Sequence, residues 1–179
     1  KKAIAAALDF EQRARLPESG NWADFRTRPT EADAGAAGVP TPTPPEAGVS
    51  WCHGAPGILV SRLLVAPVVR HPDLDADVEV ALETTTRREQ DLPDHLCCGT
   101  SGRADILLHA GRTLSRQDAV AAALAEADGL LARSAHPRVP LGRAFGILNP
   151  GLFDGMAGVG YALLRSAAPD EVPCVLAWE

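Results

Sequence analysis

Three cysteines stand directly before glycine-rich turns, where their thiols could bind a metal ion. Cys52 is followed by His53–Gly57, and the adjacent Cys97 and Cys98 are followed by Gly99–Gly102. Each of these segments holds two glycines three positions apart, so we expect both segments to form the same kind of turn and to bring their sulfur atoms to a common point. Zinc is the ion that suits this set, because it accepts sulfur ligands in a tetrahedral array and does not change its oxidation state.

Three cysteine ligands would leave one position of a tetrahedral zinc ion open, which is typical of catalytic rather than structural zinc sites. We expect all three cysteines to lie at helix starts, where the positive end of the helix dipole lowers the pKa of a thiol and favours the thiolate that binds metal. The spacing alone leaves two interpretations open, because ligands this far apart match no zinc finger or ribbon and isolated cysteines are often simply buried. Cys174 lacks the glycine context, and we expect it to be a buried apolar residue.

A third copy of the glycine frame, Phe153–Gly160, contains no cysteine, so the frame itself is independent of the thiols. The first glycines of the three frames, Gly54, Gly99 and Gly155, are 45 and 56 residues apart, which is the period of a two-helix unit. We expect a buried helix to begin at each frame, where glycine permits a tight turn, and an amphipathic helix to follow the first two. This pattern predicts alternating inner and outer helices.

The remaining periodic segments also favour an all-α domain. Residues 2–16, 75–89 and 119–133 carry apolar residues at helical spacing. The run Ile58–Val65 could by itself be a buried strand or a buried helix, and we assign it as a helix because no hairpin dipeptide or clear alternating strand appears in the sequence. Residues 27–50 are rich in proline and predict a loop or spacer, which could border a substrate groove or be a variable surface loop.

The chain has 179 residues, of which 46% are hydrophobic and 22% charged, as expected for one globular domain with its own core. A formal net charge of -6 gives no general attraction to nucleic acid or to anionic lipid. The longest apolar run, residues 58–69, is too short to span a bilayer, and Lys1 and Lys2 are not followed by a secretory signal. We therefore expect no nucleic-acid partner, no membrane span and a cytoplasmic location, in which the four cysteines are thiols or metal ligands rather than disulfides.

Several segments, taken in order, resemble the successive motifs of the lanthionine synthetase C-like (LanC-like) family. The segments are residues 51–57, 96–102 and 151–165, together with 21–26 and 172–176. The resemblance implies an α/α toroid whose inner helices carry a catalytic zinc at one mouth. It also implies conjugate addition of a peptide cysteine thiol to dehydroalanine or dehydrobutyrine, which forms lanthionine or methyllanthionine thioether rings in a dehydrated precursor peptide.

Carried over by position, the resemblance makes Cys52 and Cys97 zinc ligands, and it places Cys98 where many members have histidine, which implies an all-cysteine site. His53 stands where members carry histidine or tyrosine, and two roles remain open for it: donating a proton to the enolate that follows sulfur attack, or packing beside the ligand. The likeness is to the C-terminal cyclase domain of class II (LanM-type) bifunctional synthetases, whose dehydratase domain lies upstream.

Two catalytic residues of the family, a histidine and an aspartate, have no counterpart in this sequence. We therefore expect residues 1–179 to be the C-terminal portion of a single cyclase domain, with the dehydratase domain upstream. The alternatives are a non-cyclising zinc-binding or thiol-binding scaffold of the same family and a structural zinc protein. We expect Trp22 to pack in the core rather than line a pocket, and Arg103 and Asp105 to hold a helix start. The remaining histidines are expected to be structural or exposed: His71, His95, His109 and His136.

Overall fold

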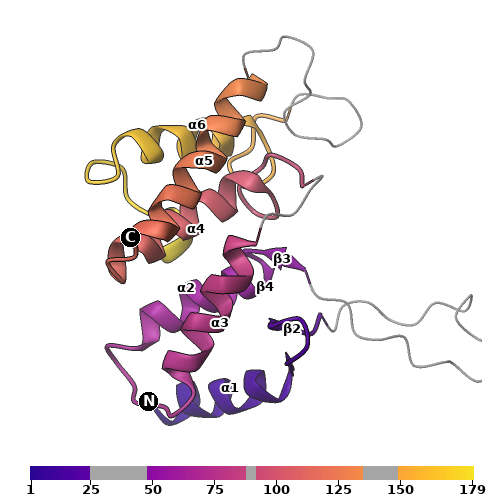
Figure 1. Cartoon of the computed structure of the whole chain (residues 1–179), viewed down its shortest axis with the longest axis vertical. Coiled ribbons are helices and arrows are strands. Elements are labelled where there is room, and N and C mark those ends of the chain that lie inside the picture. Colours follow the sequence, from indigo (N-terminus) through magenta and orange to yellow (C-terminus); the bar gives the residue numbers. More distant parts are fainter. Residues whose placement is uncertain (25–47, 88–91, 135–148) are drawn as a thin grey trace, which may run out of the picture.

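The computed structural model describes residues 1–24, 48–87, 92–134 and 149–179, and this part of the chain is mostly helical. The all-α prediction is confirmed (Figure 1). The described residues form six α-helices and a short 3-10 helix: α1 (Lys2–Arg13), α2 (Ala55–Val65), α3 (Leu74–Thr86), α4 (Thr100–Thr113), α5 (Gln117–Ser134), α6 (Met156–Ala167) and η2 (Val175–Ala177). Nowhere in these four ranges is a helix both long enough and apolar enough to cross a bilayer.

Helices α2 and α4 form the interior of the domain. Helix α2 packs on α3, helix α4 packs on α5, and α4 also contacts α2 and α6 (Figure 1). Helix α4 is buried on almost every side, whereas α5 buries one stripe at helical spacing, made up of Ala119, Ala123, Ala127 and Leu130. The predicted alternation of inner and outer helices is therefore seen from α2 to α5. Helix α6 differs, because it buries one face and leaves Leu164 65% exposed.

One hydrophobic cluster joins segments that are far apart in the sequence. Leu59 of α2, Ile106 of α4 and Leu176 of η2 are all fully buried in it, and burial of each such side chain stabilises the fold by about 1.5–3 kcal/mol. Trp22 is also buried in this cluster, so the predicted packing role is confirmed. The core thus anchors the C-terminal segment as well as the long helices.

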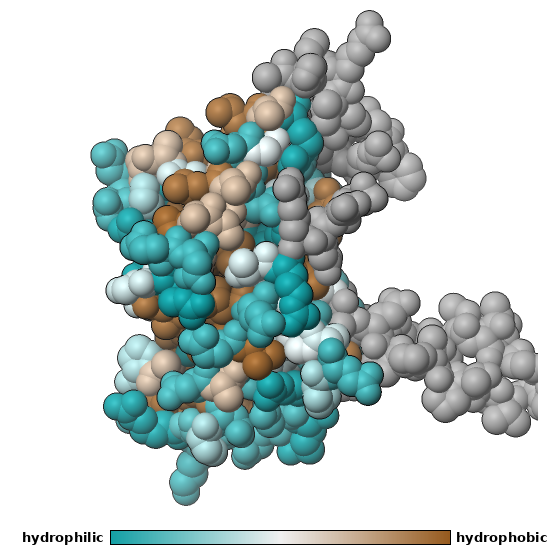
Figure 2. Space-filling view, in the orientation of Figure 1, coloured by the Kyte–Doolittle hydropathy of each residue, from teal (hydrophilic) through white to brown (hydrophobic). Residues whose placement is uncertain are grey.

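The face drawn in Figure 2 is mainly hydrophilic around α1 and more apolar towards α5 and α6.

Two short antiparallel strand pairs were not predicted. Strand β1 (Arg15–Leu16) pairs with β2 (Asn21–Trp22), and β3 (Val49–Ser50) pairs with β4 (His53–Gly54). Strands of two residues have no alternating pattern that periodicity could reveal. Strand β3 occupies the last two residues of the predicted 27–50 loop, and residues 27–47 lie outside the described residues.

The side chain of Asn21 joins the two strand pairs to the start of α2. Its Oδ1 accepts hydrogen bonds from the backbone N–H groups of Trp22 and Ala55, at 2.9 and 2.8 Å. Its Nδ2 donates to the Gly48 carbonyl at 3.0 Å. One amide therefore satisfies three backbone groups, because its oxygen accepts twice and its nitrogen donates.

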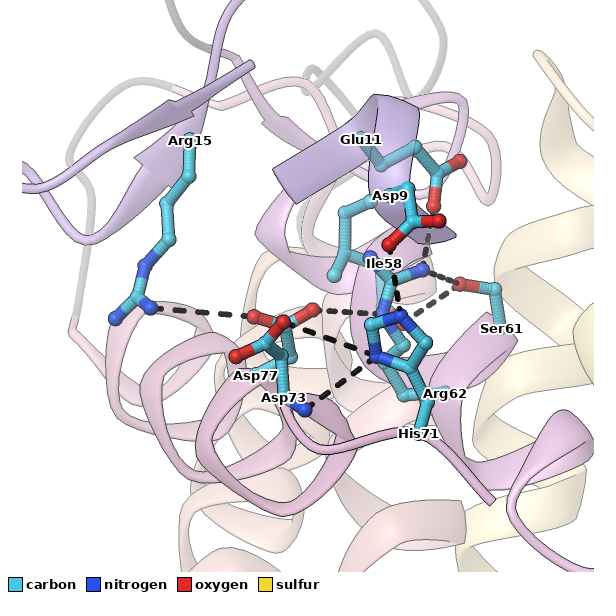
Figure 3. Close-up of polar contacts among 9 residues, drawn as sticks. All are labelled: Asp9, Glu11, Arg15, Ile58, Ser61, Arg62, His71, Asp73 and Asp77. Atoms are coloured by element: carbon cyan, nitrogen blue, oxygen red, sulfur yellow. Dashed lines mark hydrogen bonds and ion pairs between the residues drawn. The ribbon is translucent and has the colours of Figure 1, made fainter. Parts of the chain in front are cut away.

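Charged contacts join α1 to α2 and to the loop between α2 and α3 (Figure 3). The buried Arg62 guanidinium of α2 donates through Nε to Asp77 Oδ2 of α3 at 3.0 Å and through Nη1 to Glu11 of α1. The His71 ring, in the loop between α2 and α3, lies 3.2 Å from Asp9 of α1. Within α1, all of which is described, Leu8 is the only buried residue, so polar contacts supply much of the helix's attachment.

Arg103 and Asp105 hold α4 to its neighbours rather than holding its first turn. Arg103 pairs with Glu126 of α5. Asp105 pairs with Arg165 of α6 at 3.0 Å and accepts a hydrogen bond from Tyr161. Burial raises the pKa of Asp105, while the Arg165 charge opposes that rise. The prediction about a helix start is wrong because both side chains point across helix interfaces.

Candidate metal centre

The sulfur atoms of Cys52, Cys97 and Cys98 all lie within 4.8 Å of one another. The Cys98 sulfur is 3.1 Å from that of Cys52 and 3.3 Å from that of Cys97. The structure therefore brings the three predicted ligands to one point. Cys174 is buried elsewhere, where its thiol donates to Asp105 Oδ2 at 3.5 Å, as expected for a core residue.

Two turns that each precede a buried helix carry these thiols. Cys52 lies in the turn of the β3–β4 hairpin, just before α2, and Cys97 and Cys98 lie in the turn before α4. The N-cap residues of α2, α4 and α6 are Gly54, Gly99 and Gly155. The prediction that a helix begins at each glycine frame is therefore confirmed, although the third helix, α6, buries only one face rather than being a buried helix.

The three frames share one backbone arrangement, which explains why each needs two glycines. A Cβ atom on either glycine would overlap the carbonyl oxygen of the residue six positions earlier in the chain. Gly54 also has a φ of 98°, a conformation that favours glycine. The overlapping pairs are Gly54 with Gly48, Gly57 with Trp51, Gly99 with Pro93, Gly102 with Leu96, Gly155 with Asn149, and Gly158 with Leu152.

Neighbouring elements hold the Cys97–Cys98 turn on several sides. The Cys97 N–H donates to the Phe153 carbonyl at 2.7 Å. Arg133 of α5 donates twice to the Asp94 carboxylate, at 2.6 and 3.3 Å, and Ser101 donates to the Asp94 carbonyl. The turn is therefore fixed from α5 and from the third glycine frame as well as from α4.

Two histidines lie beside the sulfurs. The His53 Nδ1 is 3.0 Å from the Cys52 sulfur, and its Nε2 is 3.3 Å from Ser50 Oγ and 3.9 Å from Asp24. His95, whose role in this turn was not predicted, accepts the Cys98 N–H on its Nδ1 at 3.3 Å. Burial lowers the pKa of His95 more than the nearby acidic groups raise it. The sequence feature that could have indicated this role of His95 is its position two residues before the cysteine pair.

The other predicted histidines are away from the sulfurs or outside the described residues. His71 and His109 are largely buried and lie beside carboxylates, so both are structural, as expected. His136 falls in 135–148, which lies outside the described ranges.

Burial raises the pKa of both Cys97 and Cys98, and the nearby Cys52 thiol raises each further. The prediction that the helix dipole lowers the pKa is therefore wrong for these two thiols. Loss of hydration and the approach of other sulfurs outweigh the dipole, because each additional thiolate would repel its neighbours. A cation at the common point reverses this balance, since thiols that bind a metal are deprotonated outright.

The donor set fits zinc. Two sulfurs bound at about 2.3 Å to one tetrahedral zinc lie about 3.8 Å apart. The sulfurs in the structure, within 4.8 Å of one another, reach such an arrangement through small side-chain movements. Three soft thiolates from two turns also favour zinc over ions that prefer oxygen ligands. Cys52 is exposed, so a thiol from outside can approach the cluster.

A comparison with protein families agrees with this geometry. The sequence model of the family described as "Lanthionine synthetase C-like protein" matches residues 1–177. The match includes all three glycine frames and the three clustered cysteines. Since it takes in nearly the whole chain, this protein belongs to the lanthionine synthetase C-like family.

Proposed function

We propose that the protein is a zinc-dependent lanthipeptide cyclase. The observation that supports it is the convergence of three sulfurs at one accessible point in a member of this family. We further propose that residues 1–179 form the C-terminal portion of a single α/α-toroid cyclase domain of the class II (LanM-type) synthetases, with a dehydratase domain upstream. A cytoplasmic location follows from the need to keep such thiols reduced.

The chain's own residues have distinct parts in this function. Cys52, Cys97 and Cys98 would hold the zinc, which supplies a positive charge that lowers the pKa of a substrate thiol and favours its thiolate near neutral pH. The thiolate sulfur forms a bond to the β-carbon of dehydroalanine or dehydrobutyrine. The electron pair of the carbon–carbon double bond moves towards the α-carbon and carbonyl, and the resulting enolate takes up one proton at the α-carbon.

His53 is the candidate donor of that proton. Its ring touches the Cys52 sulfur, so it lies next to the point where a substrate thiol would react. The alternative role, support of Cys52 by packing, uses the same contact. Substitution of His53 by Phe separates the two roles, because Phe keeps a packed ring and cannot donate a proton.

The experiment uses a dehydrated model peptide that carries one cysteine and one dehydroalanine. Cyclisation leaves the mass unchanged, so the product is detected by its failure to react with a thiol-alkylating reagent. Because two catalytic residues of the family have no counterpart in residues 1–179, the assay uses the zinc-loaded protein together with its upstream part, which we expect to protect the peptide from alkylation. Cys98→Ala in that protein should abolish the protection. Cys174→Ala is the matched control and should keep full activity, because Cys174 is a buried cysteine that is not among the clustered sulfurs.

The same assay distinguishes the alternative function. A non-cyclising scaffold would bind zinc and a free thiol, yet the peptide would remain open to alkylation after release from the protein. A purely structural zinc would bind no thiol at all, because such a site has no open position. Either result would contradict the proposed cyclase.

A further inference from the structure

The third glycine frame, which has no cysteine, contacts both cysteine turns through one residue, Phe153. The Phe153 carbonyl accepts the hydrogen bond from the Cys97 N–H at 2.7 Å. The Phe153 ring stacks on Trp51, with ring centroids 5.6 Å apart and an angle of 14° between the planes. Trp51 directly precedes Cys52 in the sequence. Phe153 is therefore bonded to one cysteine and stacked on the neighbour of another.

The C-terminal segment also holds Trp51. Its Nε1 donates to the Leu176 carbonyl at 3.2 Å, and its ring lies 6.3 Å from that of Trp178. Leu176 is fully buried in the core, so this anchor is rigid. Trp51 thus has two anchors, the Phe153 ring and the backbone of η2.

The first cysteine turn needs such support because its own hairpin is small. Strands β3 and β4 have two residues each, and Cys52 lies exposed in the turn between them. An isolated two-stranded hairpin is marginally stable at best in water. The distance between the Cys52 sulfur and the other two sulfurs therefore depends on contacts made from outside the hairpin.

We propose that Phe153 is a positioning residue of the metal centre. Its backbone carbonyl contacts the Cys97–Cys98 turn and its ring contacts the Cys52 turn, so a single residue links the two halves of the ligand set. The inference rests on the proposed zinc site and goes beyond it, because it assigns a role in that site to the frame that carries no ligand. This positioning role requires an aromatic ring at position 153, because the backbone carbonyl would be present whatever the residue.

The test is metal binding by the whole chain, followed with cobalt(II), whose thiolate charge-transfer and ligand-field bands report on ligand number and geometry. Phe153→Ala and Phe153→Leu both keep the carbonyl and remove the ring, and leucine also keeps apolar volume. Phe153→Tyr restores the ring. Leu152→Ala is the matched control, because Leu152 is the adjacent residue and is 38% exposed, close to the 40% of Phe153.

We expect Phe153→Ala and Phe153→Leu to bind cobalt about 10-fold more weakly, the lower end of the loss seen when outer contacts of a metal site are removed. Their bands should change in intensity, whereas Phe153→Tyr and Leu152→Ala should match the unsubstituted chain. A general loss of stability would not produce this pattern, and urea unfolding of the metal-free variants measures that loss separately.

Two results would overturn the proposal in distinguishable ways. If the unsubstituted chain binds cobalt and both ring-less variants match its affinity and spectrum, Phe153 has no positioning role and the metal centre stands. If the unsubstituted chain binds no cobalt through its thiols, the proposed metal centre itself fails and this inference fails with it.

Discussion

The Nε of Arg62 donates a hydrogen bond to Oδ2 of Asp77 at 3.0 Å, between α2 and α3, where the two side chains are 1% and 3% exposed (Figure 3). The Arg62 Nη1 also donates to Glu11 of α1, whose side chain is 39% exposed. A buried ion pair stabilises little in itself, but removal of one partner leaves an uncompensated buried charge. The two carboxylates around Arg62 should therefore differ sharply in their effect on stability.

We predict that Asp77→Asn lowers the free energy of unfolding by about 3 kcal/mol, the cost of breaking a buried pair. Glu11→Gln should cost about 1 kcal/mol or less, because water already screens its pair with Arg62. Urea unfolding followed by circular dichroism measures both. Equal losses in the two variants would contradict the assignment of Asp77 as the main partner of Arg62.

Two glycines of α6 that are two positions apart should respond to alanine in opposite directions. A Cβ on Gly158 would overlap the Leu152 carbonyl and lie 2.9 Å from the Cβ of Leu96, whereas a Cβ on Gly160 meets no atom within 4 Å. We expect Gly158→Ala to destabilise the chain by about 2 kcal/mol through overpacking. Gly160→Ala should stabilise it by up to about 1 kcal/mol, because alanine favours helix. Thermal unfolding of the two variants tests this, and loss of stability in both would show that α6 packs differently.

The helices and the sites where they begin could be predicted because their signals are local. Apolar spacing marks α3 and α5, and the repeated glycines mark the starts of α2, α4 and α6. The strand pairs could not be predicted, because they have no period of their own and depend on the side chain of Asn21.

Parts of the candidate site could not be predicted from the sequence, for a different reason. The contacts of Phe153 and His95 with the cysteine turn use the backbone N–H groups of Cys97 and Cys98, which every residue except proline possesses. Residue types therefore give no sign of these bonds. The thiol pKa values were predicted in the wrong direction because the helix dipole was weighed without the burial of the sulfurs, which the sequence does not show.

His109, a largely buried residue of α4, should contribute to the pH dependence of the protein's stability. Burial lowers the pKa of His109 below the usual 6.5, although Glu179, 3.7 Å away, opposes the shift and Arg165 adds to it. The unfolded chain therefore takes up a proton at His109 at a higher pH than the folded chain does. The contribution of His109 to stability is therefore present above pH 6.5 and is lost as the pH falls towards the pKa that His109 has in the folded chain.

We expect His109→Gln to flatten the fall in the free energy of unfolding between pH 6.5 and 5, because glutamine is neutral throughout. Urea unfolding at half-unit steps of pH, for both chains, gives the difference directly. An unchanged slope would mean that other groups cause the loss and that His109 is not a source of acid sensitivity.

Zinc should stabilise the chain through the three clustered cysteines and not through Cys174. Cys174 is buried, its thiol donates to Asp105 Oδ2 at 3.5 Å, and its sulfur is not one of the three that lie within 4.8 Å of one another, so it is poorly placed to share the ion. Free zinc at 100 times its dissociation constant should raise the free energy of unfolding by about 2.7 kcal/mol, and a chelator should remove that increment. Cys98→Ala should lose the increment, while Cys174→Ala should lower the stability of the metal-free chain and keep the increment intact. Retention of the increment in Cys98→Ala, or its loss in Cys174→Ala, would place the metal elsewhere, because the candidate ligand group that the described residues offer is the three sulfurs within 4.8 Å of one another.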